Sequence, residues 1–138
     1  MRFPVILSLV LFCPQESLAE GALAVGLPSD VAKHGFAFGA GWNGKSSESA
    51  QAEALRNCRR APNSSEATRA LCRVVQTFEH QCFAFAMDRD LGTPGIGWAI
   101  SSSLEAAERE AISLCSDTAG EDRRQFCEIS LSNCDLGL

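Results

Sequence analysis

The 138-residue chain is short of histidine and of basic residues: it has two His, and 12 Lys and Arg against 17 Asp and Glu, for a formal net charge of −5. This balance argues against nucleic-acid binding, which needs a basic face. No CxxC pair occurs, and neither His34 nor His80 has a second histidine at ligand spacing. We therefore expect no zinc site, no other metal and no cofactor.

Long apolar runs are also missing, except at the N-terminus. Residues 5–12 are apolar but too few to span a bilayer, which takes roughly 20 residues. Residues 17–19 (Ser-Leu-Ala) place small side chains where a signal peptidase cuts. We predict a signal peptide over residues 1–19, cleaved after Ala19. Residues 20–138 would then form one periplasmic or secreted domain that is not an integral membrane protein.

Cysteine, by contrast, is abundant, with seven in the chain. Cys13 falls within the predicted signal peptide, so six remain in the mature domain. An even number of cysteines in an exported chain is typical of disulfide bonds.

The mature sequence repeats itself, with units at about 21–82 and 83–134. The matched features are Glu48-x-Ala50 with Glu105-x-Ala107, Cys58 with Cys115, Cys72 with Cys127, Cys82 with Cys134, and Gly41-Trp42 with Gly97-Trp98. The repeat favours disulfides Cys58–Cys72 and Cys115–Cys127, each joining a helix to the next strand. The remaining pair, Cys82–Cys134, would tie the two units together.

Each unit has the pattern strand, strand, helix, strand. The expected strands are 22–26, 34–42 and 72–81 in the first unit and 83–88, 96–101 and 125–133 in the second, with helices at 47–60 and 103–116. The fold class is α+β, with antiparallel sheet and one helix per unit. One continuous sheet and two packed sheets both fit this pattern.

The strands alternate large and small side chains. Phe36, Phe38 and Trp42 alternate with small residues, and Trp98 lies in a similar strand of the second unit. Because side chains alternate between the two faces of a strand, each sheet has a small face and an aromatic face. We expect the Ala-rich helices on the small face, and either the other unit or a partner on the aromatic face. Trp42, Trp98, Phe36 and Phe38 are therefore the candidate binding residues.

The candidates for catalysis are few. Hydrolysis needs a nucleophile with a base, paired carboxylates or a metal. His80 lies on an apolar strand pattern, and Glu108 falls within the apolar arc of a helix, where its counterpart is Gln51. Nothing in the spacing provides a nucleophile for either. Residues 88–92 (Asp-Arg-Asp-Leu-Gly) fit a solvated turn better than a calcium loop, because a third carboxylate is missing.

Several local motifs carry a resemblance to a known family. They are the Gly-Ala-Leu-Ala opening at Gly21, a Gly-Trp before an Ala/Glu-rich helix, a cysteine at the helix end, and Cys-Arg-Val-Val at Cys72. Over residues 21–134 the chain resembles the small exported bacterial domains of domain-of-unknown-function family four-one-eight-nine. The resemblance implies a secreted or periplasmic domain with paired cysteines. It implies no activity, cofactor or catalytic residue.

These observations favour an exported, non-catalytic binding or protein-interaction domain. Its partner would be another protein or a cell-envelope component. One alternative is a secreted hydrolase that uses His80 or Glu108. Another is an inhibitor of a cationic enzyme such as a lysozyme, which the net charge of −5 would attract.

Overall fold

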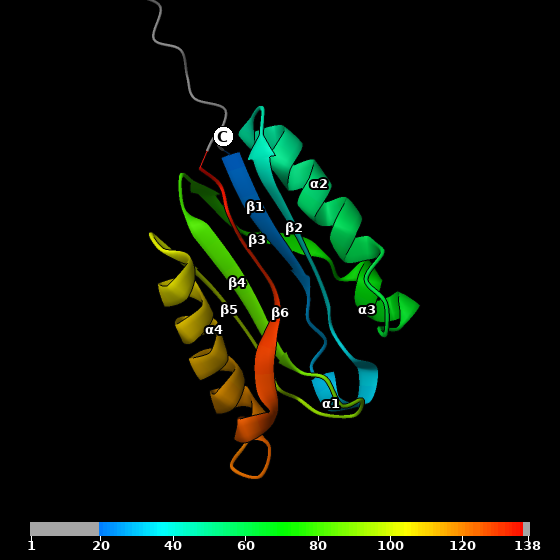
Figure 1. Ribbon diagram of the computed structural model, residues 1–138. Helices are drawn as coiled ribbons and strands as arrows, with labels where there is room; N and C mark the ends of the chain where they lie inside the picture. Colours follow the sequence, from blue (N-terminus) through cyan, green and yellow to red (C-terminus); the bar gives the residue numbers. More distant parts are fainter. Residues whose placement is uncertain (1–19, 137–138) are drawn as a thin grey trace, which may run out of the picture.

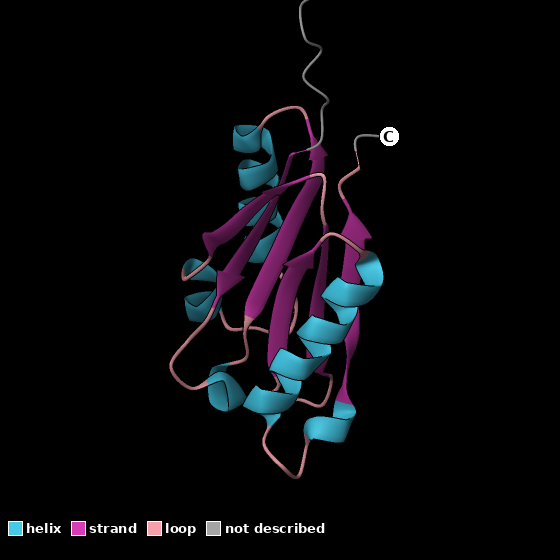
Figure 2. Ribbon diagram, turned by 90° about the vertical axis from the view of Figure 1, so that its left-hand side faces the viewer, coloured by secondary structure: helices cyan, strands magenta, loops and turns pink. Residues whose placement is uncertain are grey.

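The computed structural model describes residues 20–136. The predicted signal peptide and its cleavage site lie outside the described residues. The chain forms four layers, with two sheets packed between the two long helices (Figures 1 and 2). The strands are β1 (Glu20–Gly26), β2 (Ala37–Gly44), β3 (Arg73–Glu79), β4 (Cys82–Asp88), β5 (Ile96–Ser101) and β6 (Cys127–Cys134). The helices are α1 (Val31–His34), α2 (Ser47–Arg59), α3 (Glu66–Ala70), α4 (Leu104–Ala119) and the short 3-10 turn η1 (Arg124–Phe126).

The strands form two separate three-stranded antiparallel sheets, in the orders β2-β1-β3 and β5-β4-β6. In each unit the first strand is central and the other two flank it. The α+β class, the antiparallel pairing and one long helix per unit are confirmed. Of the two sheet arrangements that the sequence left open, the structure has two sheets.

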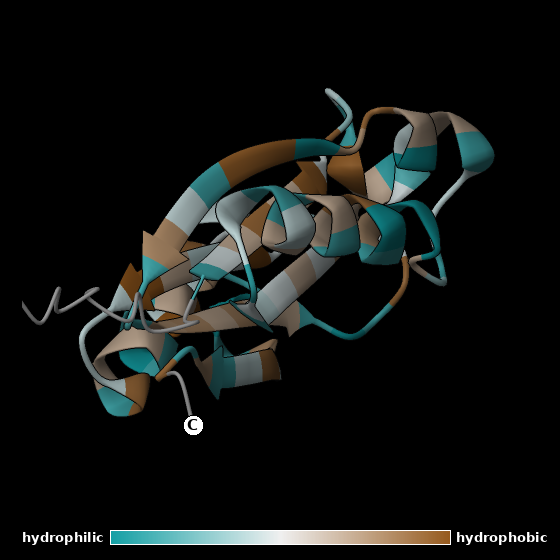
Figure 3. Ribbon diagram, turned by 90° about the horizontal axis from the view of Figure 1, so that it is seen from above, coloured by the Kyte–Doolittle hydropathy of each residue, from teal (hydrophilic) through white to brown (hydrophobic). Residues whose placement is uncertain are grey.

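Each long helix covers the small face of its own sheet. A Cβ on Gly39 would collide with the backbone of Ala54 and Cys58, and a Cβ on Gly97 would collide with that of Ala111 and Cys115. Helix and strand therefore approach too closely for any side chain at these two positions. Along both helices, hydrophilic and hydrophobic segments alternate, as expected when one face is buried (Figure 3).

The same contacts correct one detail of the repeat. Since Ala54 and Cys58 correspond to Ala111 and Cys115, Gly39 is the counterpart of Gly97. The predicted match of Gly41-Trp42 with Gly97-Trp98 is therefore wrong by two residues. A shift of two preserves which face each side chain occupies, so the sequence pattern could not reveal it.

The aromatic faces of the two sheets cover each other. Phe83 and Phe85 are buried at the centre, together with Leu23, Val25 and Phe78. Phe38 of the first sheet meets Phe85 of the second with ring centroids 4.3 Å apart. Of the two expected covers for the aromatic faces, the other unit and a partner, the structure has the other unit.

Three disulfides join Cys58 to Cys72, Cys82 to Cys134 and Cys115 to Cys127. These are the pairs that the repeat favours, and they suggest an extracellular or periplasmic environment. One expectation is wrong, however. Cys82 lies in β4 directly opposite Cys134 of β6, so this bond lies within the second sheet and does not tie the units together. The corresponding positions in the first sheet are Glu20 and Glu79.

Several element boundaries differ from expectation by one to three residues, and α4 ends at Ala119 instead of residue 116. Two of the differences have a clear cause. The strand expected from residue 34 begins at Ala37, because Asp30 caps the short helix α1 by accepting a hydrogen bond from the amide of Lys33. The strand expected to reach residue 81 ends at Glu79, and His80 follows in a turn with a left-handed φ of 51°. Within residues 20–136, no helix is long and apolar enough to cross a membrane.

Candidate functional site

A cleft of about 480 Å³ opens between the two units at one end of the sandwich. Its lining comes from the segment around α1, from the end of α2 and from the loop after β4. The lining residues used below are Phe36, Phe38, Arg60, Met87, Asp88, Arg89 and Asp90. The volume lies within the range of about 300–1,000 Å³ that small-molecule sites occupy.

The apolar part of the cleft is set by the alternation in β2. Phe38 lies in β2 and Phe36 lies directly before it, and their rings stack with centroids 5.9 Å apart. Phe38 also contacts the buried ring of Phe85, which fixes it against the inter-sheet core. Met87 follows Phe85 by two residues in β4 and lines the cleft as well. The cleft therefore has a preformed apolar floor contributed by both sheets.

A network around Arg123 fixes the acidic rim. Its Nε donates to Oδ2 of Asp88 over 2.7 Å, and its Nη2 donates to Oδ1 of Asp88 over 2.9 Å. The same Nη2 donates to Asp90 over 2.5 Å. Hydrogen bonds from Arg123 are the largest cause that lowers the pKa of the buried Asp88 below its usual value. The guanidinium also lies over the ring of Phe126, with its Cζ 4.3 Å from the ring centroid.

Residues 89–95 form the hairpin loop between β4 and β5, as the sequence indicates, but Asp88 is the buried last residue of β4 and is not solvated as expected. The amide of Asp90 donates to Oδ1 of Asp88 over 3.1 Å. Arg89, in the same turn, pairs with Glu128 at 2.5 Å. Within residues 20–136, no three His, Cys, Asp or Glu side chains are grouped so that they could hold a metal.

Arg60 is a charged lining residue without an ion-pair partner among residues 20–136. It lies at the C-terminal end of α2, and its side chain makes no hydrogen bond or ion pair to any described residue. Arg89 pairs with Glu128, whereas the carboxylates of Asp88 and Asp90 share the one guanidinium of Arg123, so that this cluster keeps one net negative charge. Among the described lining residues, Arg60 is therefore the cation without an ion-pair partner, and one carboxylate charge of the Asp88–Asp90 pair also remains uncompensated.

The four candidate binding residues do not form one patch. Phe36 and Phe38 line the cleft. Trp42 and Trp98 are half-buried against the inter-sheet core instead, where their rings lie 5.4 Å from that of Phe83 and 6.4 Å from that of Phe85, respectively. Sequence reasoning missed Arg60 and Met87 as cleft residues. No local signal marks them, because the cleft exists only once the two units pack together.

The catalytic candidates lie elsewhere. His80 is exposed in the β3–β4 turn, not on a strand face as its sequence pattern indicates. Glu108 accepts a hydrogen bond from the hydroxyl of Ser132 over 2.6 Å, which joins α4 to β6. Its counterpart Gln51 donates to Ser47 over 3.1 Å within α2. Neither His80 nor Glu108 lines the cleft.

Comparison with known proteins gives one family and no individual relative. Neither a curated protein nor a solved structure matches the chain significantly. A family model described as a domain of unknown function matches residues 21–134, which include all three disulfides and nearly every element of both units. The chain therefore belongs to the family described as Domain of unknown function (DUF4189).

Proposed function

We propose that this chain is an exported, non-catalytic binding domain whose ligand occupies the cleft between the two units. The ligand would be a small anionic amphiphile, with an apolar body and one carboxylate or phosphate group. The observation that carries the proposal is the cleft itself, which combines an apolar floor with a single unpaired cation, Arg60. A lipid-like component of the cell envelope has this chemistry.

The apolar floor would supply most of the affinity. Phe36, Phe38 and Met87 offer ring and thioether surface that a ligand can cover, at roughly 25 cal/mol for each Å² of apolar area removed from water. The contact with Arg60 would be exposed to solvent, and such pairs contribute about 0.2–1 kcal/mol. The cation would therefore select the ligand's charge more than it strengthens binding.

The Arg123 network favours a preformed site. It holds Asp88 and Asp90 of one wall, while the contact between Phe38 and Phe85 fixes the floor. A cleft that is already ordered loses little conformational entropy when a ligand binds. Export is supported by the three disulfides and by the apolar N-terminal segment of the sequence.

Three ten-carbon probes of different charge would test the proposal: decanoate, decanol and decylammonium. Binding would be followed by NMR chemical-shift changes of the isotopically labelled exported protein. We expect saturable shifts in the cleft residues and a two- to fivefold preference for decanoate over decanol, as about 0.4–1 kcal/mol at Arg60 implies. Decylammonium should bind more weakly than both.

Matched variants would separate charge from shape. Arg60→Gln should abolish the preference for decanoate and leave decanol binding unchanged. Arg56→Gln, one turn earlier on α2 and outside the cleft, is the control and should keep the preference. Shifts confined to residues outside the cleft, or a preference for decylammonium, would refute the proposal.

A further inference from the structure

Asp135, the residue after β6, is a buried carboxylate with one unused oxygen. Its exposed fraction is 0 %. Oδ1 accepts a hydrogen bond from the backbone amide of Asn43 over 2.7 Å, whereas Oδ2 is buried without a hydrogen-bond partner among residues 20–136. Buried carboxylate oxygens without partners are costly, so a buried oxygen of this kind points to a missing donor.

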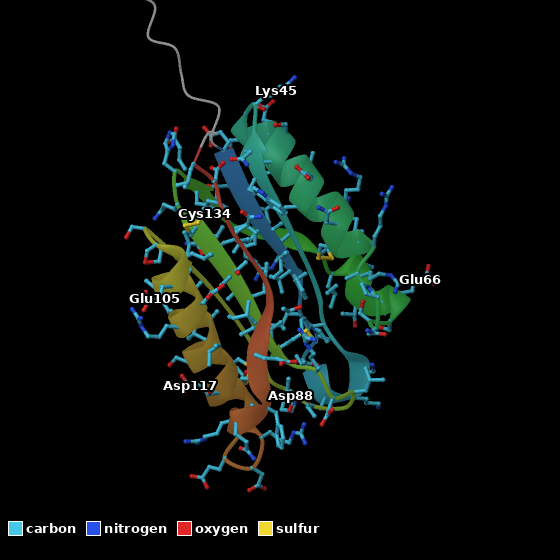
Figure 4. The ribbon with its side chains drawn as sticks, in the orientation of Figure 1. Lys45, Glu66, Asp88, Glu105, Asp117 and Cys134 are labelled. Carbon is cyan, nitrogen blue, oxygen red and sulfur yellow. A yellow bond between two sulfur atoms is a disulfide. The ribbon has the colours of Figure 1, made fainter. Side chains whose placement is uncertain are left out.

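The backbone that Asp135 binds lies next to the start of β1. Asn43 has a left-handed φ of 53° and immediately precedes Gly44, the Cα partner of Glu20. The pairing between β1 and β2 is irregular just after this point. In Figure 1, β6 ends and β1 begins at the same end of the molecule. This end is opposite to the cleft, as the labels for Cys134 and Asp88 show in Figure 4.

We propose that Asp135 binds the α-ammonium group that cleavage after Ala19 creates on Glu20. The inference rests on the predicted cleavage site and is independent of the ligand proposed for the cleft. Cleavage adds water across the peptide bond between Ala19 and Glu20, which leaves a carboxylate on Ala19 and an amine on Glu20. At neutral pH that amine is protonated, with three donors and a positive charge, where the uncleaved chain has one neutral amide donor.

Removal of the leader would thus complete the polar pairing of Asp135. Oδ2 would gain a charged donor, while Oδ1 keeps its bond to Asn43. The processed chain would hold the start of β1 to the end of β6, and this charged contact would add to the bond from Asn43 that already joins the two sheets at this end. The Cys82–Cys134 disulfide cannot do this, because it lies within one sheet.

The test compares four chains, each exported as the full precursor and each checked by intact mass. They are the natural chain, a chain with one glycine inserted between Ala19 and Glu20, the Asp135→Asn variant, and the variant that combines both changes. The insertion moves the ammonium one residue upstream. Asparagine keeps an oxygen that can accept from Asn43, but it removes the charge. The insertion and Asp135→Asn should each lower the folding equilibrium constant, measured by urea unfolding, about tenfold. Because both changes remove the same contact, the folding equilibrium constant of the combined variant should be no lower than that of either single variant.

A second measurement covers the case in which Asp135→Asn does not fold. The α-amine can be acylated with an N-hydroxysuccinimide ester, with the exposed Lys33 and Lys45 as internal references. We expect the α-amine of Glu20 to react at least tenfold more slowly, relative to these lysines, in the natural chain than in the chain with the inserted glycine. Equal reactivity, additive stability losses, or a mature N-terminus other than Glu20 would overturn the inference.

Discussion

Removal of the Cys82–Cys134 disulfide should cost more stability than removal of either other disulfide, although the fold should survive. The bond closes a loop with a sequence separation of 52, against 14 for Cys58–Cys72 and 12 for Cys115–Cys127. In the chain-entropy model these separations correspond to about 4 kcal/mol for the long loop and about 3 kcal/mol for each short one.

The first sheet explains why the fold should survive. It has the same strand order as the second, yet Glu20 and Glu79 occupy the positions that correspond to Cys82 and Cys134. A three-stranded sheet with this topology therefore forms without a disulfide at this place. The bond should act mainly by restricting the unfolded chain.

The assay is urea unfolding of three exported double variants, in each of which both cysteines of one pair are replaced by alanine so that no free thiol remains. Far-ultraviolet circular dichroism of the Cys82→Ala/Cys134→Ala variant should match that of the natural chain. Its free energy of unfolding should fall about 1 kcal/mol further than in the other two variants. A smaller loss than in either short-loop variant, or a loss of sheet signal, would refute this reasoning.

Three further predictions concern the helix contact, the buried carboxylate and the cleft. Gly97→Ala should cost at least about 1–3 kcal/mol, because the new Cβ meets the backbone of α4, and thermal unfolding would measure the loss. Hydrogen bonds from Arg123 lower the pKa of Asp88 in the folded state, so the ionised Asp88 stabilises the fold fully above the unfolded pKa of 3.8. This stabilisation is lost as the pH falls below that value, through the lower pKa of the folded state. Asp88→Asn should therefore flatten the pH dependence of the free energy of unfolding, measured in urea, over this range. Phe85→Ala should lower the free energy of unfolding by about 3–5 kcal/mol, because Phe85 is buried between the sheets. Phe36 is half-buried at the cleft floor, so Phe36→Ala should weaken decanoate binding with a much smaller loss of stability. Ligand titration and urea unfolding of both variants would measure these effects.

The elements that the sequence predicts well are those set by local pattern. Alternation of large and small residues in β2, β4 and β5 predicts strands, and the spacing of buried alanines in α2 and α4 predicts helices that pack closely. Cysteines at matching places in two units favour two of the disulfides for the same reason. These features require no knowledge of which segments meet in space.

Features that depend on the connection between the units could not be predicted in the same way. Only His80 and Gln81 separate β3 from β4, and the left-handed φ of His80 lets the chain leave one sheet and enter the next. Residues other than glycine are uncommon in this conformation, and the alternating pattern around His80 predicts a continuous strand. The sequence pattern is therefore equally consistent with one continuous sheet and with two separate sheets. The cleft was hidden for the same reason, since Arg60 and Asp88 come together only across the packed units.

The cleft forms where the two repeats differ, which favours it as the site of function. In both units the loop from the first strand to the second belongs to this end of the sandwich, with residues 27–36 in one unit and 89–95 in the other. The first loop contains α1 and ends in Phe36, whereas the second is a shorter hairpin loop without a helix, and Arg123 binds Asp88 and Asp90 at its start. Repeated helices and sheets build a symmetric frame, and two copies of one loop would line this end with equivalent residues. The unlike loops instead place Phe36 of the apolar floor on one side and the acidic pair Asp88 and Asp90 on the other, and Arg60 at the end of α2 adds a cation. This is the asymmetry needed to orient an amphiphile.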